Sequence, residues 1–197
     1  PLHANSIYVL ELSSYQLDLV ESLKCDVAVL LNVTPDHLER HGGFAGYMAA
    51  KRRIFDNQTH ADFAIIGMDA PATQATMMSL KSKDKQQVIG VSSNFALGRG
   101  VSVVEGRLFD SQNGRATLVG DLREIETLPG RHNHQNAAAA YAACRALGLD
   151  PSVIIDAMMT FPGLSHRQEI VGKVGKVTFV NDSKATNGQA AVQALKS

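Results

Sequence analysis

The sequence predicts an α/β fold in which a mostly parallel sheet is flanked by helices and carries a small antiparallel β appendage. Apolar runs typical of buried strands alternate with helical patterns through the first half of the chain, and short runs broken by turn residues follow them. The pattern changes again after Gly163. We therefore expect one domain over residues 1–163 and the beginning of a second α/β domain over residues 164–197.

The first half of the chain predicts strands joined by right-handed helical crossovers. Residues 7–12 form an apolar run typical of a buried strand, and residues 15–23 have helical spacing with Ser13 or Ser14 as the cap. A second apolar strand follows over residues 26–32. The alternation continues with a helix, a strand, a helix and a strand over residues 44–55, 62–66, 72–80 and 87–91.

The second half predicts hairpins and then helices. Residues 101–126 contain short apolar runs interrupted by Gly106, Asn113-Gly114 and Gly120-Asp121, as expected for an antiparallel appendage. An Ala-rich helix is predicted over residues 136–147, ending at Gly148, and another from Pro151 to about Thr160. Paired strands are expected over residues 169–173 and 177–180, and a helix from residue 189 onward.

Composition excludes several classes of protein. The chain has 197 residues, 45% of them hydrophobic, which is enough to bury a core, and no apolar run approaches the roughly 20 residues that span a membrane. Basic and acidic residues balance at 19 each, so nucleic acid is not an expected partner. Cys25 and Cys144 lie far apart in apolar surroundings, which favours free thiols and a cytoplasmic location.

Charged residues follow the first two predicted strands. Glu11 ends one strand and Asp36-His37 follows the other, so adjacent parallel strands would place Glu11 beside His37, where they could share a cation. A carboxylate bonded to the next helix and a merely solvated loop explain these residues about as well. Lys51 begins a basic trio with Arg52-Arg53, a pattern more typical of a solvated helix face.

Three later segments carry polar side chains suited to a ligand. Asn133 and Asn136 share one face of a helix start, although helix capping is an equally simple explanation. His132 and His134 lie two residues apart, but no further Cys, His or acidic residue follows at zinc-ligand spacing, so a zinc site is not expected. His166-Arg167 follows the proposed boundary as an exposed pair, and residues 181–187 place an acid, a base and two hydroxyls in one turn that could equally be a helix cap.

The strings Glu11-Leu12-Ser13-Ser14, Tyr47-Met48-Ala49-Ala50-Lys51 and residues 181–187 together resemble the Mur ligase family. The resemblance implies a Rossmann-like second domain, ATP and Mg²⁺ as cofactors, and a Lys51 that becomes carbamylated. It assigns the metal to Glu11, His37 and Lys51, and catalysis to His37, Lys51 and Lys184. It assigns the nucleotide to Asn133, Asn136, His166, Arg167 and Asp182, and the substrate to Ser183, Lys184 and Thr186.

The residues around Lys184 match the family member that adds D-glutamate to UDP-N-acetylmuramoyl-L-alanine through an acyl phosphate, in peptidoglycan precursor synthesis. No G-x-x-x-x-G-K-[ST] phosphate loop occurs in the 197 residues. We therefore expect these residues to be part of a longer, monomeric ligase and to be inactive by themselves. A non-catalytic nucleotide-binding module and a family member with another amino-acid specificity remain alternatives. A carbamyl-lysine metallohydrolase is disfavoured because few histidines and acids surround Lys51.

Overall fold

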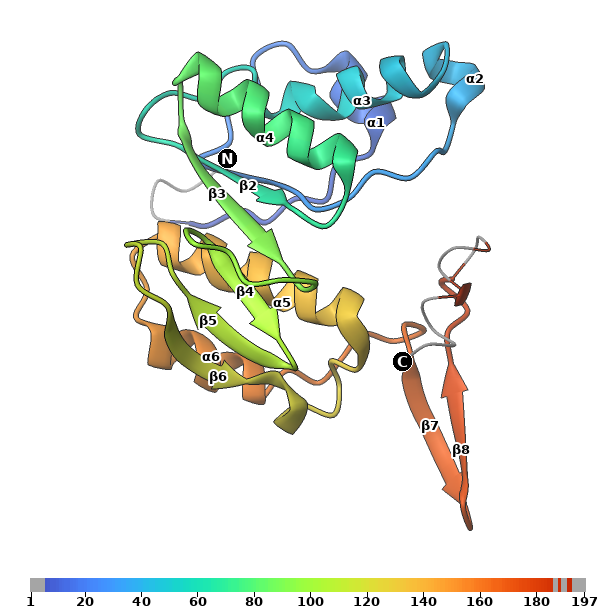
Figure 1. The fold of residues 1–197 in the computed structure, drawn as a ribbon. Helices are drawn as coiled ribbons and strands as arrows, with labels where there is room; N and C mark the ends of the chain where they lie inside the picture. The colour runs from blue at the N-terminus through green and yellow to red at the C-terminus, as the bar shows by residue number, and fades with distance from the viewer. Residues whose placement is uncertain (1–5, 186–187, 189–190, 193–197) are drawn as a thin grey trace.

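The computed structural model of the protein describes residues 6–185, 188 and 191–192. Its main feature is a six-stranded mixed sheet with the strands in sequence order (Figure 1). Strands β1 to β4 are parallel, and β5 and β6 are antiparallel to their neighbours. The strands are β1 (Val27–Leu30), β2 (Phe63–Gly67), β3 (Gln87–Ser92), β4 (Val101–Val104), β5 (Arg107–Asp110) and β6 (Thr117–Asp121).

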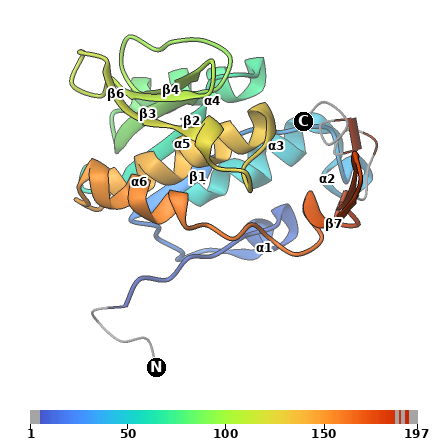
Figure 2. The ribbon, with the colours of Figure 1, turned by 90° about the horizontal axis from the view of Figure 1, so that it is seen from below.

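Helices cover both faces of this sheet. Figure 2 shows α5 and α6 on one side of the sheet and α4 on the other. The helices are α1 (Ser14–Leu19), α2 (Leu38–His41), α3 (Phe44–Arg52), α4 (Pro71–Lys83), α5 (Gly130–Ala146) and α6 (Pro151–Met159), with short 3-10 turns η1 (Arg53–Phe55) and η2 (Leu122–Glu124). The predicted alternation of strands and helices, and the parallel crossovers it implies, are confirmed from β1 to β3.

Side chains alternate between two cores along β2. Ile65 belongs to the core formed with α5 and α6, whereas Ala64 and Ile66 belong to the core formed with α3 and α4, and all three are fully buried. This alternation follows from the two-residue period of a strand. Because both faces are covered, β2 is an apolar run, as expected for a central parallel strand.

The prediction of a strand over residues 7–12 is wrong. These residues are among those described and form no strand, and the side chains of Ile7, Val9 and Leu10 are 73%, 92% and 63% exposed. In the described part of the chain β1 is an edge strand that pairs only with β2. An apolar run predicts burial, but a strand also requires a hydrogen-bonded neighbour, which residues 7–12 lack here.

Several boundaries differ from the predictions. The cap at Ser13 is confirmed as a capping box with Gln16, but α1 ends at Leu19 where Val20 becomes extended. Helix α2 was not predicted, and α5 begins at Gly130 rather than at residue 136. The predicted antiparallel hairpins of β4 to β6 are confirmed, and the β3–β4 pairing joins them to the main sheet.

A second, two-stranded antiparallel sheet contains β7 (Glu169–Val174) and β8 (Val177–Asn181), as predicted. It stands apart from the six-stranded sheet (Figure 1). Apolar side chains along both strands are about half exposed or more, including Val171, Val174 and Phe179. Most of the helix predicted from residue 189 lies outside the described residues. None of the helices within the described ranges has the length and apolarity needed to cross a membrane.

Candidate functional site

Polar side chains gather where β1, β2 and β3 end. Asp69, just after β2, accepts hydrogen bonds from Ser92 Oγ at 2.5 Å and from the Ser93 backbone at 2.9 Å. Gln135 of α5 donates to the same carboxylate at 2.8 Å, and Asn32, after β1, reaches Gln135 at 3.4 Å. This network joins the carboxyl edge of the sheet to α5, and such edges are where open α/β sheets bind ligands.

Lys51 lies in the last turn of α3. Its Nζ atom is 5.1 Å from the centre of the Tyr47 ring, one helical turn earlier. Burial lowers the pKa of the Lys51 ammonium, while the negative charges of Asp36 and Glu11 oppose the shift without cancelling it. The structure therefore brings Glu11 and Asp36 within electrostatic reach of a half-buried lysine, even though Glu11 does not end a strand.

His37 precedes α2 in the left-handed backbone region, with φ of 50°. Its backbone N–H donates to Asp36 Oδ1 at 2.9 Å, and its ring lies edge-on to Tyr15 at 5.0 Å between centroids. His37 and Tyr15 line a pocket of about 420 Å³ together with Leu38, Glu39 and Arg40. A non-glycine residue held at positive φ is uncommon and marks a constrained position.

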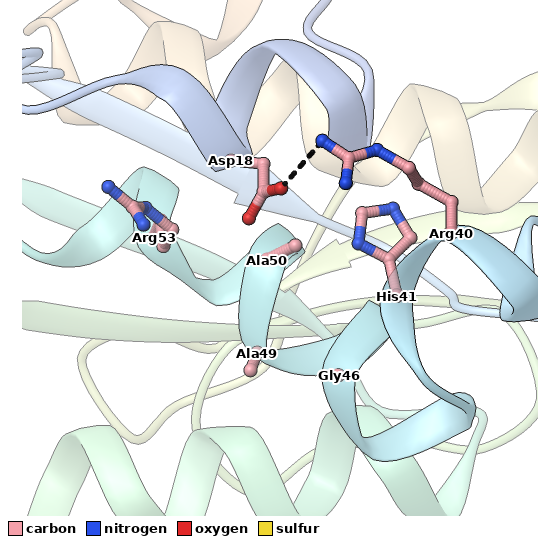
Figure 3. Close-up of a pocket in the computed structure, with 7 residues that line it drawn as sticks. All are labelled: Asp18, Arg40, His41, Gly46, Ala49, Ala50 and Arg53. Carbon is pink, nitrogen blue, oxygen red and sulfur yellow. Dashed lines mark hydrogen bonds and ion pairs between the residues drawn. The ribbon is translucent and has the colours of Figure 1, made fainter.

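A neighbouring pocket of about 460 Å³ lies between α1, α2 and α3 (Figure 3). Asp18 and Arg40 form an ion pair of 3.3 Å across it, and His41 points toward the same space. Its floor is built from small residues of α3. The lining residues are Asp18, Arg40, His41, Gly46, Ala49, Ala50 and Arg53.

The chemistry of these side chains suits magnesium only in part. Within residues 6–185, 188 and 191–192, no group of three His, Cys, Asp or Glu side chains is arranged to hold a metal ion. Magnesium does not need such a cage, because it commonly binds through one or two carboxylates, water and substrate phosphates. Glu11 and Asp36 are carboxylates close enough to Lys51 to raise its pKa against the effect of burial.

The start of α5 carries the predicted nucleotide contacts. Asn133 Nδ2 donates to the backbone carbonyl of Pro129 at 2.7 Å, so this side chain closes the first helical turn. Asn136 is exposed. Burial lowers the pKa of both His132 and His134, which favours neutral imidazoles at the helix start.

Two segments predicted as separate motifs meet next to the β7–β8 hairpin. Asn181 Nδ2 lies 2.8 Å from His166 Nδ1, and Asp182 accepts from the Gln168 backbone at 3.1 Å. The Lys184 backbone N–H donates to the His166 carbonyl at 3.1 Å, and Lys184 is exposed. The side chains of Arg167 and Ser183 are exposed as well, and Thr186 lies outside the described residues.

Sequence reasoning gave no role to four residues of these clusters, Tyr15, His41, Asp69 and Gln135, and it noted Ser14 only as a possible cap and as part of a motif. Tyr47 was noted only as part of a motif, although its place four residues before Lys51 put both side chains on one face of a helix. No local spacing links Asp69 with Gln135, which are 66 residues apart. Only the folded chain brings such pairs together.

Comparison with known proteins shows the family to which this chain belongs. The model of the Mur ligase middle domain matches residues 3–144. The chain belongs to the Mur ligase family. It is 55% identical over 196 residues to UDP-N-acetylmuramoylalanine--D-glutamate ligase of Caulobacter sp. (strain K31), and 53% identical to the Rhodospirillum rubrum protein of the same name. The two alignments cover all of this chain but only 42% and 41% of the relatives, so the chain spans about two fifths of their length.

Solved Mur ligase structures share the fold. The UDP-N-acetylmuramoylalanyl-D-glutamyl-2,6-diaminopimelate--D-alanyl-D-alanyl ligase of Acinetobacter baumannii aligns with a TM-score of 0.66 and 24% identity, over 93% of this chain and 39% of that one. MurF of Thermotoga maritima, in complex with ADP, aligns with a TM-score of 0.60 and 20% identity, over 88% of this chain and 39% of that one. Both likenesses concern the fold alone.

Proposed function

We propose that the whole protein to which this chain belongs joins D-glutamate to UDP-N-acetylmuramoyl-L-alanine with ATP as the energy source, in peptidoglycan precursor synthesis in the cytoplasm. The observation that carries the proposal is the 55% identity, over the whole chain, to ligases of that name. The domain division belongs to the same proposal: residues 1–163 are the incomplete central domain and residues 164–197 begin the next.

The surroundings of Lys51 support this chemistry. A half-buried amine with a lowered pKa loses its proton more readily and can then add carbon dioxide, which turns a cation into a carboxylate. Glu11, His37 and carbamylated Lys51 would hold magnesium, which when bound neutralises charge on the transferring phosphate. Asp36, which sequence reasoning grouped with His37, is a further candidate ligand because it acts on Lys51 electrostatically.

The reaction we propose has two chemical steps. The carboxylate of the L-alanyl group attacks the γ-phosphorus of ATP, forming an acyl phosphate and releasing ADP. The amine of D-glutamate then attacks the acyl carbon, an amide bond forms, phosphate leaves and the amine gives up a proton. Positioning and charge neutralisation supply most of such catalysis.

Each predicted residue has a place in this scheme. Asn133, Asn136, His166 and Asp182 would bind the nucleoside of ATP, and Arg167 its phosphates. The exposed side chains of Lys184 and Ser183, with Thr186, would meet the acyl phosphate and D-glutamate. The bonds between the His166 and Asp182 segments support this assignment, because they join the nucleotide and substrate motifs in one unit.

The test is phosphate release by the full-length protein with ATP, magnesium and UDP-N-acetylmuramoyl-L-alanine. We expect release that depends on D-glutamate and falls at least about 100-fold in His37→Ala and Lys184→Ala. His60→Ala and Lys176→Ala, at exposed positions away from the proposed site, are the matched controls. Release with another amino acid would keep the family and overturn the specificity, and no release with any would favour a non-catalytic nucleotide-binding module.

Carbamylation has its own test. Protein equilibrated with ¹³C-bicarbonate is expected to show a carbamate signal in the ¹³C NMR spectrum, and Lys51→Ala is expected to lose it. A signal that survives in Lys51→Ala would place the modification on another lysine. A wild-type spectrum without any carbamate would remove Lys51 from the metal site and leave Glu11, Asp36 and His37.

A further inference from the structure

His41 lies at the end of α2, between two aromatic side chains of other helices. Its Nε2 atom is 3.0 Å from the hydroxyl of Ser14 on α1, a side chain that is only 2% exposed. The centroid of its ring is 5.7 Å from that of Tyr15 and 5.5 Å from that of Tyr47. A buried hydroxyl needs a partner, so the bond to Ser14 fixes the plane of the imidazole.

The two aromatic neighbours of His41 each touch a residue of the proposed site. The Tyr15 ring lies edge-on to His37 at 5.0 Å, and the Tyr47 ring lies 5.1 Å from Lys51 Nζ. His37, Tyr15, His41, Tyr47 and Lys51 therefore form one continuous row of side chains. His41 is its centre, and the two proposed metal ligands are its ends.

The backbone holds the centre of this row as well. An added Cβ atom at Gly46 of α3 would lie 1.8 Å from the carbonyl oxygen of His41, so α3 packs directly against the end of α2. Gly42, which follows His41, takes a left-handed φ of 67° and turns the chain toward α3. The backbone N–H of Tyr47 donates to the Gly43 carbonyl at 3.1 Å in the first turn of α3.

We propose that His41 is a positioning residue, which sets the distance between His37 and Lys51 by holding Tyr15 and Tyr47. This inference rests on the function proposed above and adds a residue to its machinery. His41 acts through its neighbours, because its ring lies beside Tyr15 and Tyr47, whose own rings lie next to His37 and Lys51. A small displacement of reacting groups lowers turnover far more than it lowers substrate affinity.

Two variants of the full-length protein separate the contacts of His41. His41→Phe keeps a ring between Tyr15 and Tyr47 but loses the bond to Ser14, whereas His41→Gln keeps a hydrogen-bonding group and loses the ring. We expect kcat to fall about 10- to 100-fold in His41→Gln and less in His41→Phe, with the KM for ATP and D-glutamate within about twofold of wild type. His60→Ala is the control, on an exposed turn at the opposite edge of the sheet.

A second readout does not depend on activity. In buffer depleted of carbon dioxide, the rate of reductive methylation of each lysine is followed by peptide mass spectrometry. We expect Lys51 to react several-fold faster in His41→Gln, because Tyr47 no longer covers it. Lys24, which is paired with Asp62, is expected to keep its wild-type rate and so reports that the fold is intact.

Ser14→Ala tests the same row without touching His41, and guards against variants of His41 that fail to fold. It is expected to reproduce the His41→Phe effect on kcat, and Ser14→Ala with His41→Phe is expected to be no worse than either alone. Wild-type kcat and an unchanged Lys51 rate in Ser14→Ala and in a folded His41→Gln would overturn the inference while leaving the proposed function intact. Absence of D-glutamate-dependent turnover in the wild type would instead refute the function, and the methylation rates would still decide whether His41 positions Lys51.

Discussion

Gln135 donates a hydrogen bond of 2.8 Å to Asp69, and this contact ties the first half of α5 to the edge of the sheet where β2 ends. Gln135 is 6% exposed. Asn133 and Asn136 lie on either side of it along α5. The position of the predicted nucleotide contacts thus depends on a bond between two residues that are distant in sequence.

Replacement of Gln135 by Leu is expected to destabilise the chain. The substitution keeps the size of the side chain but removes a donor from the partly buried Asp69 carboxylate, which costs about 1–3 kcal/mol of unfolding free energy. Urea denaturation measures the change. Gln87→Leu, at an exposed position with a longer bond of 3.2 Å to His60, is expected to change stability by less than about 0.5 kcal/mol. Equal effects of the two substitutions would show that the link between Gln135 and Asp69 adds nothing.

Asp62 is expected to make stability depend on pH. Burial alone would raise the pKa of this carboxyl, but hydrogen bonds from Lys24 and Thr59 outweigh burial and lower it below 3.8. The contribution is therefore fully present above the pKa of the unfolded chain, about 3.9, and is lost as pH falls through the folded value. Asp62→Asn is expected to cost about 1–3 kcal/mol at pH 7, and the difference from wild type to shrink below pH 4.

The measurement for Asp62 is urea denaturation at a series of pH values between 7 and 2.5. Asp84→Asn, at the exposed end of α4, serves as the control, since Asn tolerates the left-handed φ of 46° found there. A stability difference between wild type and Asp62→Asn that stays constant across the series would contradict the assignment.

Gly67→Ala is expected to be strongly destabilising. An added Cβ would lie 1.8 Å from the carbonyl oxygen of Leu31, where the chain leaving β1 passes the end of β2. Relief of that overlap requires the backbone to move, which costs about 3 kcal/mol. Thermal denaturation measures the change. In the same measurement Gly98→Ala, with no atom within 4 Å of the added carbon, is expected to stay within about 0.5 kcal/mol of wild type.

Lys51→Met is expected to separate stability from activity. In buffer depleted of carbon dioxide, where Lys51 is not carbamylated, the substitution removes the cost of half-burying an ammonium and keeps an apolar stem beside Tyr47, so the unfolding free energy stays equal or rises. Phosphate release by the full-length protein is expected to fall at least about 100-fold. Lys81→Met, on the exposed surface of α4, is expected to change neither. A large loss of stability in Lys51→Met would show that Lys51 serves the fold rather than the site.

Local patterns predicted most of the elements correctly. The cap at Ser13, the turns at Gly106 and Gly114, and the helix start at Pro151 each depend on the chemistry of a few consecutive residues. Residues 7–12 show where such patterns fail. Their apolar run looks like a buried strand, but a strand exists only with a partner, and pairing is a property of the whole sheet.

The candidate site divides in the same way. Motifs identified Glu11, His37, Lys51 and the segments around His166 and Asp182, because these strings are specific to a family. The contacts around them were not found from the sequence. His41 is hydrogen-bonded to Ser14, 27 residues away in the chain, and Gln135 to Asp69, 66 residues away. A contact between distant residues leaves no local spacing, so no periodicity reveals it.

By itself, therefore, the sequence determined the α/β class, the order of the central elements, the Mur ligase resemblance and the identity of the candidate side chains. Only the tertiary structure decided that residues 7–12 leave β1 at the sheet edge, that the hairpins extend the main sheet, and that His41 stands between Tyr15 and Tyr47. The reason is physical. Propensities, caps and turns act within a few residues, whereas ladder pairing, burial and the row from His37 to Lys51 come from segments that meet only when the chain folds.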